Sequence, residues 1–116
     1  MDQKEQFNAA LSQLGAGNPG AAATLCEKGL DSFPGDANLL CLLAKACLAQ
    51  RNFEQAGQRI EEAIRLVPDF ALAHETLGDL MLVEGKVAQA RRAFETAMRL
   101  DPTRPSPRKK IDYTRK

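Results

Sequence analysis

Three sets of side chains in this sequence are of the types that carry chemistry. They are the only histidine, His74, the carboxylates Glu75 and Asp79, and the cysteines Cys26, Cys41 and Cys47. A histidine serves as a general base when a substrate cavity and an orienting partner surround it. Carboxylates four residues apart share one face of a helix, and cysteines in Cys-x-x-Cys spacing bind metal or react. Each set therefore needs support from the rest of the sequence.

That support is missing for all three sets. His74 has no accompanying Ser, Cys or carboxylate constellation, so we expect a structural role. Glu75 and Asp79 lack a third metal ligand, and we expect them to form the solvated rim of a groove. The cysteines are odd in number without Cys-x-x-Cys spacing, which is typical of small buried side chains. With no glycine-rich phosphate loop, HExxH or GxSxG motif, the sequence predicts no catalytic residue, metal or cofactor.

A regular interval between prolines organises the chain. Pro34, Pro68 and Pro102 stand 34 residues apart in a sequence of 116 residues. A period of this length indicates stacked pairs of helices, in which no pair buries its apolar face alone. Residues of similar size recur at the same interval of 34, as in Ala22, Ala56 and Ala90, then Cys26, Ile60 and Phe94, then Gly29, Ala63 and Ala97. Within one unit, these positions are three or four residues apart. These columns predict one amphipathic helix before each proline and another upstream of it.

The third unit resembles the tetratricopeptide repeat. His74-x-x-Leu77-Gly78-x-x-Met81, Ala90-x-x-x-Phe94 and Pro102 fall at the places of that motif. The resemblance covers residues 3–104 in three units, 3–36, 37–70 and 71–104. It implies an all-α, right-handed solenoid of three helix-turn-helix repeats.

Both ends of the array depart from the pattern. In the first unit Phe7, Ala10, Leu11 and Leu14 sit one residue late, so we expect a shortened turn or a slightly rotated opening helix. Residues 103–116 carry six Lys and Arg against one acid, whereas residues 1–102 carry 10 against 14. The segment 105–116 is expected to be a basic capping helix anchored by Ile111, with a disordered basic tail as the alternative.

The resemblance also implies a concave groove lined by the first helix of each pair. The groove places that we expect to contact a partner hold Phe7, Leu11, Asn38, Cys41, Leu42, Lys45, Leu72, Glu75, Thr76, Asp79 and Leu82. Leu14, Leu48 and Leu82 recur as a column, so packing between repeats explains them as readily as binding does. Leu42 and Leu72 do not recur, and we expect these two to contact the ligand.

The residue types in the groove argue against one ligand that the family binds. Repeats that hold the C-terminal carboxylates of heat-shock chaperones use Lys, Asn and Arg at defined groove places. Here those places hold Phe7, Leu11, Leu42, Leu72 and Thr76, which offer no charge-assisted donors. We therefore expect an apolar or amphipathic peptide or helix instead.

The sequence thus predicts a non-catalytic scaffold that binds a protein or peptide, without a small-molecule substrate. Its rival is an N-terminal module of a longer enzyme or assembly protein, or a self-associating domain, so a homo-oligomer stays open. The basic tail offers weak support for contact with nucleic acid or an acidic membrane, because only Tyr113 adds an aromatic ring to it. The opening residues lack the apolar segment of a secretory signal, and we expect a cytoplasmic protein.

Overall fold

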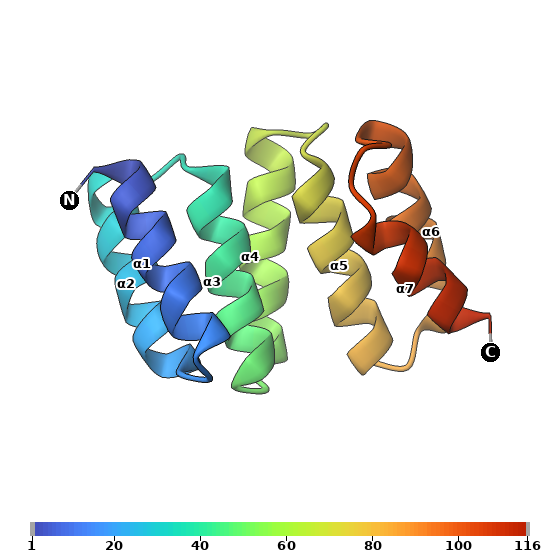
Figure 1. The fold of residues 1–116 in the computed structure, drawn as a ribbon, viewed down its shortest axis with the longest axis horizontal. Helices are drawn as coiled ribbons and strands as arrows, with labels where there is room; N and C mark the ends of the chain where they lie inside the picture. Colours follow the sequence, from blue (N-terminus) through green and yellow to red (C-terminus); the bar gives the residue numbers. More distant parts are fainter. Residues whose placement is uncertain (1, 116) are drawn as a thin grey trace.

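The structure is a computed structural model that describes residues 2–115, and this part of the chain contains seven helices (Figure 1). Their bounds are α1 Gln3–Gly15, α2 Pro19–Ser32, α3 Ala37–Ala49, α4 Phe53–Leu66, α5 Ala71–Val83, α6 Val87–Leu100 and α7 Ser106–Thr114. The prediction of an all-α solenoid of three helical pairs is confirmed. Among the described residues, no helix combines the length and the apolar character needed to cross a bilayer.

Both helices of each pair recur at an interval of 34 residues. α1, α3 and α5 begin at residues 3, 37 and 71, and α2, α4 and α6 begin at residues 19, 53 and 87. The expected shortened turn or rotated opening helix is therefore wrong. Ala10 is buried in step with Ala44 and Gly78, so α1 presents the same face to the core as α3 and α5. Leu11 does not belong to this core stripe, because it is exposed. The half-buried Phe7 packs against the same core cluster as Ala10.

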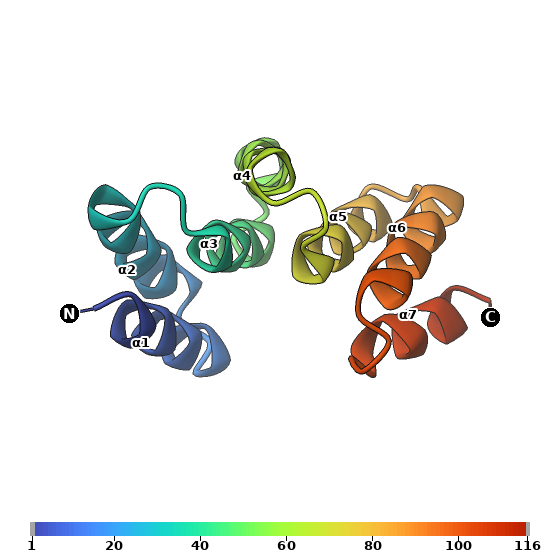
Figure 2. The same ribbon diagram turned by 90° about the horizontal axis from the view of Figure 1, so that it is seen from above.

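The three pairs form an arch with distinct inner and outer helices. Seen from above, α1, α3 and α5 line the inner side and α2, α4 and α6 the outer side, while α7 closes the end opposite α1 (Figure 2). Residues 2–115 extend over about 41 Å along the long axis, and α3 contacts both α1 and α5. The inner helices therefore form one continuous concave face.

A small residue on the inner helix lies against a large one on the outer helix in the second and third pairs. In the third pair a Cβ atom added to Gly78 would lie 2.6 Å from Cδ1 of Phe94. The equivalent positions of the second pair hold Ala44 and Ile60. All four residues are buried. The large residue fills the space that the small one leaves, which keeps the interior at close-packed density.

The cysteines belong to this packed interior, as expected. Cys26, Cys41 and Cys47 are free and at most 2% exposed. Burial raises the pKa of the Cys26 and Cys41 thiols to about 12, so both are held as neutral thiols near pH 7. They pack as small apolar side chains.

The close approach of α5 and α6 predicts the effect of adding one methyl group. Gly78→Ala should lower the free energy of unfolding by roughly 1–2 kcal/mol, because overpacking against Phe94 outweighs the better helix propensity of alanine. Urea unfolding measures the change. Gly57→Ala is the matched control, since its Cβ would meet only Leu80 at an ordinary 3.5 Å. That variant should gain stability, and a gain at Gly78 as well would contradict the packing account.

A left-handed residue ends each inner helix. Gly17, Arg51 and Gly85 stand at the same place of the three repeats, with φ of 84°, 62° and 80°. A side chain in this conformation costs about 1–2 kcal/mol, which glycine avoids. Arg51→Gly should therefore raise the free energy of unfolding by about 1 kcal/mol. Arg51→Ala retains the strain and loses the contact of the guanidinium with the Phe53 ring at 5.3 Å, so thermal unfolding should show no gain for it.

Candidate functional site: the concave face

Two open depressions lie along the helix-start edge of the concave face. The first, of about 390 Å³, is lined by Gln3, Lys4, Phe7, Asp36 and Asn38. The second, of about 300 Å³, is lined by Asn38 and by residues at the start of α5, at the end of α6 and in the connections beside them, namely Asp69, Phe70, Ala71, Leu72, Leu100, Asp101 and Arg104. Asn38 lines both depressions, which therefore adjoin at the start of α3. We call the two depressions together the trough.

The structure divides the eleven expected groove residues into two groups. Seven have solvent-accessible side chains, namely Phe7, Leu11, Asn38, Lys45, Leu72, Asp79 and Leu82. The other four are at most 3% exposed, namely Cys41, Leu42, Glu75 and Thr76. A partner lying in the groove cannot touch these four in this conformation.

The burial of Leu42 corrects the expectation that it contacts a ligand. Leu42 packs in one core cluster with Ala10, Leu43 and Ala46, because α1 lies against α3 and covers it. Cys41 packs in a neighbouring cluster with Ala73 of α5. Both positions on α3 thus face the adjoining inner helices rather than the groove.

Thr76 is withdrawn from the groove by its own helix. Its hydroxyl donates a hydrogen bond of 2.7 Å to the carbonyl oxygen of Leu72, and its side chain is fully buried. Leu72 itself is half-buried and lines the second depression. The column of Leu14, Leu48 and Leu82 is half-buried in all three repeats and packs against core clusters, as the packing interpretation expects.

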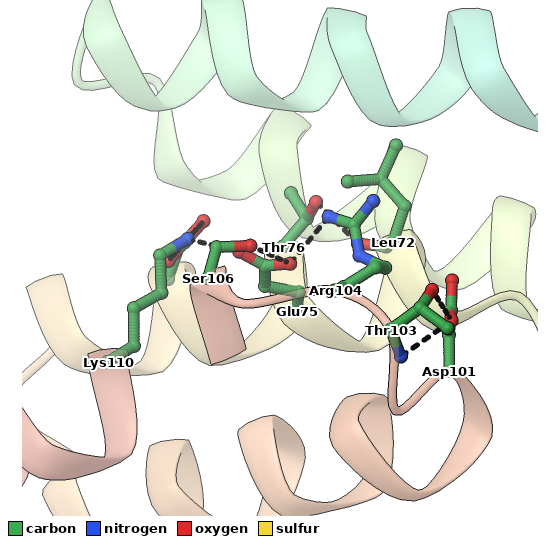
Figure 3. Close-up of polar contacts among 9 residues, drawn as sticks. Leu72, Glu75, Thr76, Asp101, Thr103, Arg104, Ser106 and Lys110 are labelled. Carbon is green, nitrogen blue, oxygen red and sulfur yellow. Dashed lines mark hydrogen bonds and ion pairs between the residues drawn. The ribbon is translucent and has the colours of Figure 1, made fainter. Parts of the chain in front are cut away.

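The expected solvated acid pair is instead the centre of an ion cluster (Figure 3). Glu75 accepts hydrogen bonds of 2.7 Å from Nη2 of Arg104 and 2.7 Å from Nζ of Lys110, and the Ser106 hydroxyl lies 3.1 Å from it. Lys110 also lies 2.9 Å from Oδ1 of Asp79. The expectation of a solvated rim is therefore wrong, because the segment after α6 folds back across α5 and covers Glu75.

The charges of Glu75 and Lys110 stabilise each other, whereas burial outweighs Lys110 at Asp79 and raises the pKa of that carboxylate. Burial alone would raise the pKa of Glu75, but the bonds from Arg104 and Lys110 outweigh it and lower that pKa. Burial likewise opposes the charge of Lys110, yet Glu75 and Asp79 raise its pKa above the ordinary value. The Glu75 contribution is lost as pH falls through its lowered pKa, and the Lys110 contribution as pH rises through its raised pKa. Between these limits both groups remain charged.

Apolar and capping contacts complete the docking of α7. Ile111 is 1% exposed and packs with Ala90 and Phe94. Arg91 of α6 donates from Nε to the Thr114 hydroxyl at 3.2 Å and from Nη2 to the Thr114 carbonyl at 3.1 Å. This guanidinium satisfies an acceptor at the end of α7 that the helix leaves free. The sequence signalled Ile111, but it contained no comparable signal for Arg91.

His74 has a local structural contact. Its Nε2 lies 2.8 Å from the carbonyl oxygen of Pro68, and since a carbonyl only accepts, the histidine donates. This bond ties the start of α5 to the preceding turn. Among the described residues, no group of three His, Cys, Asp or Glu side chains could hold a metal ion.

Stacked helical pairs with a continuous concave inner face define an α-solenoid, a class built to present extended surfaces. The family model of the tetratricopeptide repeat matches residues 13–80, which is more than half of the chain. The chain belongs to the tetratricopeptide repeat family. No curated protein sequence matches it.

Solved structures share this fold at low sequence identity. The second TPR domain of human RPAP3, in complex with the HSP70 peptide SGPTIEEVD, is 22% identical with a TM-score of 0.78, covering 96% of this chain and 92% of that chain. The Yersinia enterocolitica secretion chaperone SycD, with a peptide of the translocator YopD, is 13% identical with a TM-score of 0.77, covering 97% and 91%. An O-GlcNAc transferase of Thermobaculum terrenum is 21% identical with a TM-score of 0.87, covering 97% of this chain and 22% of that one. At these identities the likeness establishes the fold alone.

The ion cluster predicts unequal roles for two adjacent lysines. Lys110→Met leaves the buried Glu75 with one fewer cation and should lower the free energy of unfolding by about 2 kcal/mol. Lys109 is exposed and has no ion-pair partner within residues 2–115, so Lys109→Met should change the free energy of unfolding by less than about 0.5 kcal/mol. Urea unfolding gives both values, and amide exchange in α7 shows where the loss occurs. Equal effects at the two positions would contradict a specific role of Lys110.

Proposed function

We propose that this chain is a non-catalytic protein-binding scaffold that holds an apolar or amphipathic segment of its partner on the concave face. One observation carries the proposal. The inner helices α1 and α5 expose large apolar side chains, with Leu11 48% and Val83 54% exposed, beside the half-buried Phe7, Leu72 and Leu82. Exposed apolar residues that line a groove are typical of a binding surface.

The apolar residues of the outer helices are placed differently. Leu66 is the last residue of α4, and Val87 and Leu100 are the first and last residues of α6. Single exposed side chains at helix ends are normal in soluble proteins. Val83 likewise ends α5, whereas Leu11 lies within α1, so Leu11 is the exposed apolar residue that supports the inner face as the binding surface.

We further propose that the ligand is not the C-terminal carboxylate motif of heat-shock chaperones, although the RPAP3 domain of the same fold holds such a peptide. The places at which the family carries its carboxylate-binding side chains hold three apolar residues that remain accessible, Phe7, Leu11 and Leu72. The other two, Leu42 and Thr76, are buried. None of the five supplies a cationic donor.

A second proposal is favoured by one comparison. This fold covers 22% of the O-GlcNAc transferase chain that it resembles, so an array of this size also occurs as part of an enzyme. On this alternative the chain would act as an interaction module within a longer enzyme or assembly protein, or would bind a second copy of itself.

A charge placed on the groove should abolish partner binding. Leu11→Asp is the informative variant, because Leu11 is exposed and its replacement leaves the core intact. Leu66→Asp is the matched control, since Leu66 is 45% exposed on an outer helix. Affinity capture from the native cell extract should recover the same proteins with the unchanged chain and with Leu66→Asp. Leu11→Asp should fail to retain these proteins. If both variants retain the same proteins, the groove is not the binding surface.

The absence of a carboxylate-binding set predicts weak binding of the HSP70 peptide SGPTIEEVD. Fluorescence anisotropy should give a dissociation constant above about 10 μM, which corresponds to about 7 kcal/mol of binding free energy. Tighter binding that Leu72→Asp removes would show that this groove holds chaperone tails by other side chains.

A further inference from the structure

The trough along the helix-start edge of the concave face carries opposite charges at its two ends. At the α1 end, Lys4 lines the first depression and is exposed. At the far end, Asp69 and Asp101 line the second depression. A partner lying in the trough meets a cation first and carboxylates last.

The other charged groups of the trough are already engaged. Asp36, beside Lys4, accepts from the backbone N–H of Leu39 at 3.2 Å and from the Gln3 amide at 3.1 Å, so it caps α3 and offsets the helix dipole. Arg104, beside Asp69 and Asp101, is bonded to Glu75 at 2.7 Å. By contrast, Lys4 and Asp69 have no ion-pair partner among residues 2–115. Asp101 forms side-chain hydrogen bonds only with the neutral Thr103; those bonds and the charge of Arg104 lower its pKa, so it remains a carboxylate.

Apolar and amide groups lie between these poles. Phe7 forms part of the first depression, and Leu72 and Leu100 form part of the second. Asn38 is exposed where the depressions join, and its amide can both donate and accept. This order of groups suits an extended peptide, whose side chains would pack on the apolar walls while its backbone forms hydrogen bonds with the Asn38 amide.

We propose that the trough binds an extended segment of a partner protein that carries one acidic and one basic residue separated by apolar residues, with the acid at Lys4 and the base at Asp69 and Asp101. This inference rests on the proposed function and specifies the ligand of the same concave face. The spacing follows from the fold. α3 lies between α1 and α5, and neighbouring helices are about 8–10 Å apart, so the poles are separated by roughly 20 Å. An extended chain covers that distance in about six residue steps of ~3.3 Å.

Four blocked heptapeptides test the charge pattern. Each alternates alanine and leucine at its five central positions, and the two end residues are Glu and Lys, Lys and Lys, Glu and Glu, or Gln and Gln. Fluorescence anisotropy with the full chain should give the tightest binding for the Glu and Lys peptide, by at least about fivefold over the other three. Equal affinities, tighter binding of another peptide, or no binding of any would overturn the proposal.

Reversing one pole should switch the preference. Lys4→Glu makes both ends of the trough acidic, so the Lys and Lys peptide should become the tightest ligand. Asp69→Lys should shift the preference toward the Glu and Glu peptide. Lys28→Glu, at an exposed position of the outer helix α2, is the matched control and should leave the order unchanged. The same order in all four proteins would overturn the assignment of the poles.

The two proposals fail in different ways. If the peptides bind equally while Leu11→Asp still abolishes partner capture, the concave face is the binding surface and the charge pattern is wrong. If Leu11→Asp leaves partner capture intact, the proposed function itself fails.

Discussion

The architecture depends on the contact, in the second and third pairs, between a small residue on the inner helix and a large residue on its outer partner. Gly78 lies against the Phe94 ring, and the same places hold Ala44 with Ile60. The volume of one residue compensates that of the other, which keeps the interior close-packed although the side chains differ. The helices of the three pairs begin at intervals of 34 residues, and the inner helix α3 contacts both α1 and α5 along the concave face. The binding surface is thus a consequence of how the repeats pack.

The ion cluster around Glu75 determines how much of that face is open. A carboxylate on a groove-lining helix is an obvious candidate for ligand contact, but the segment after α6 brings Arg104 and Lys110 onto it. Those cations neutralise Glu75 and Asp79, while Ile111 docks against α6. The face is therefore closed over the middle of α5 and remains open along the trough and around Leu11. Removing one member of a buried charged group is costly, so the closure is specific to these side chains.

The repeat, the helices and much of the core followed from the sequence because each depends on local spacing. The prolines mark the ends of the outer helices, and the small column predicted the buried Ala56 and Ala90. Burial on the inner helices depends instead on segments distant in the sequence. Leu42 is covered by α1, and Glu75 is covered by a segment about 30 residues further along the chain. A comparison of equivalent positions among the repeats does not reveal either of these covering segments. For that reason Leu42 and Glu75 were both assigned to the open groove. Leu11 was assigned to a displaced core stripe for the related reason that spacing alone does not distinguish a core face from an exposed apolar one.

The central claim is that the inner face of α1, α3 and α5 is the surface that a partner occupies. Chemical-shift mapping of the backbone amides with the heptapeptide ending in Glu and Lys, at saturating concentration, tests it most directly. The first-turn amides of a helix have no intrahelical acceptor, so those of α1, α3 and α5 respond to a ligand in the trough. We expect the largest shifts around Lys4, Asn38 and Leu72, which lie in the first turns of α1, α3 and α5. Shifts concentrated on the outer helices α2, α4 and α6 would contradict it.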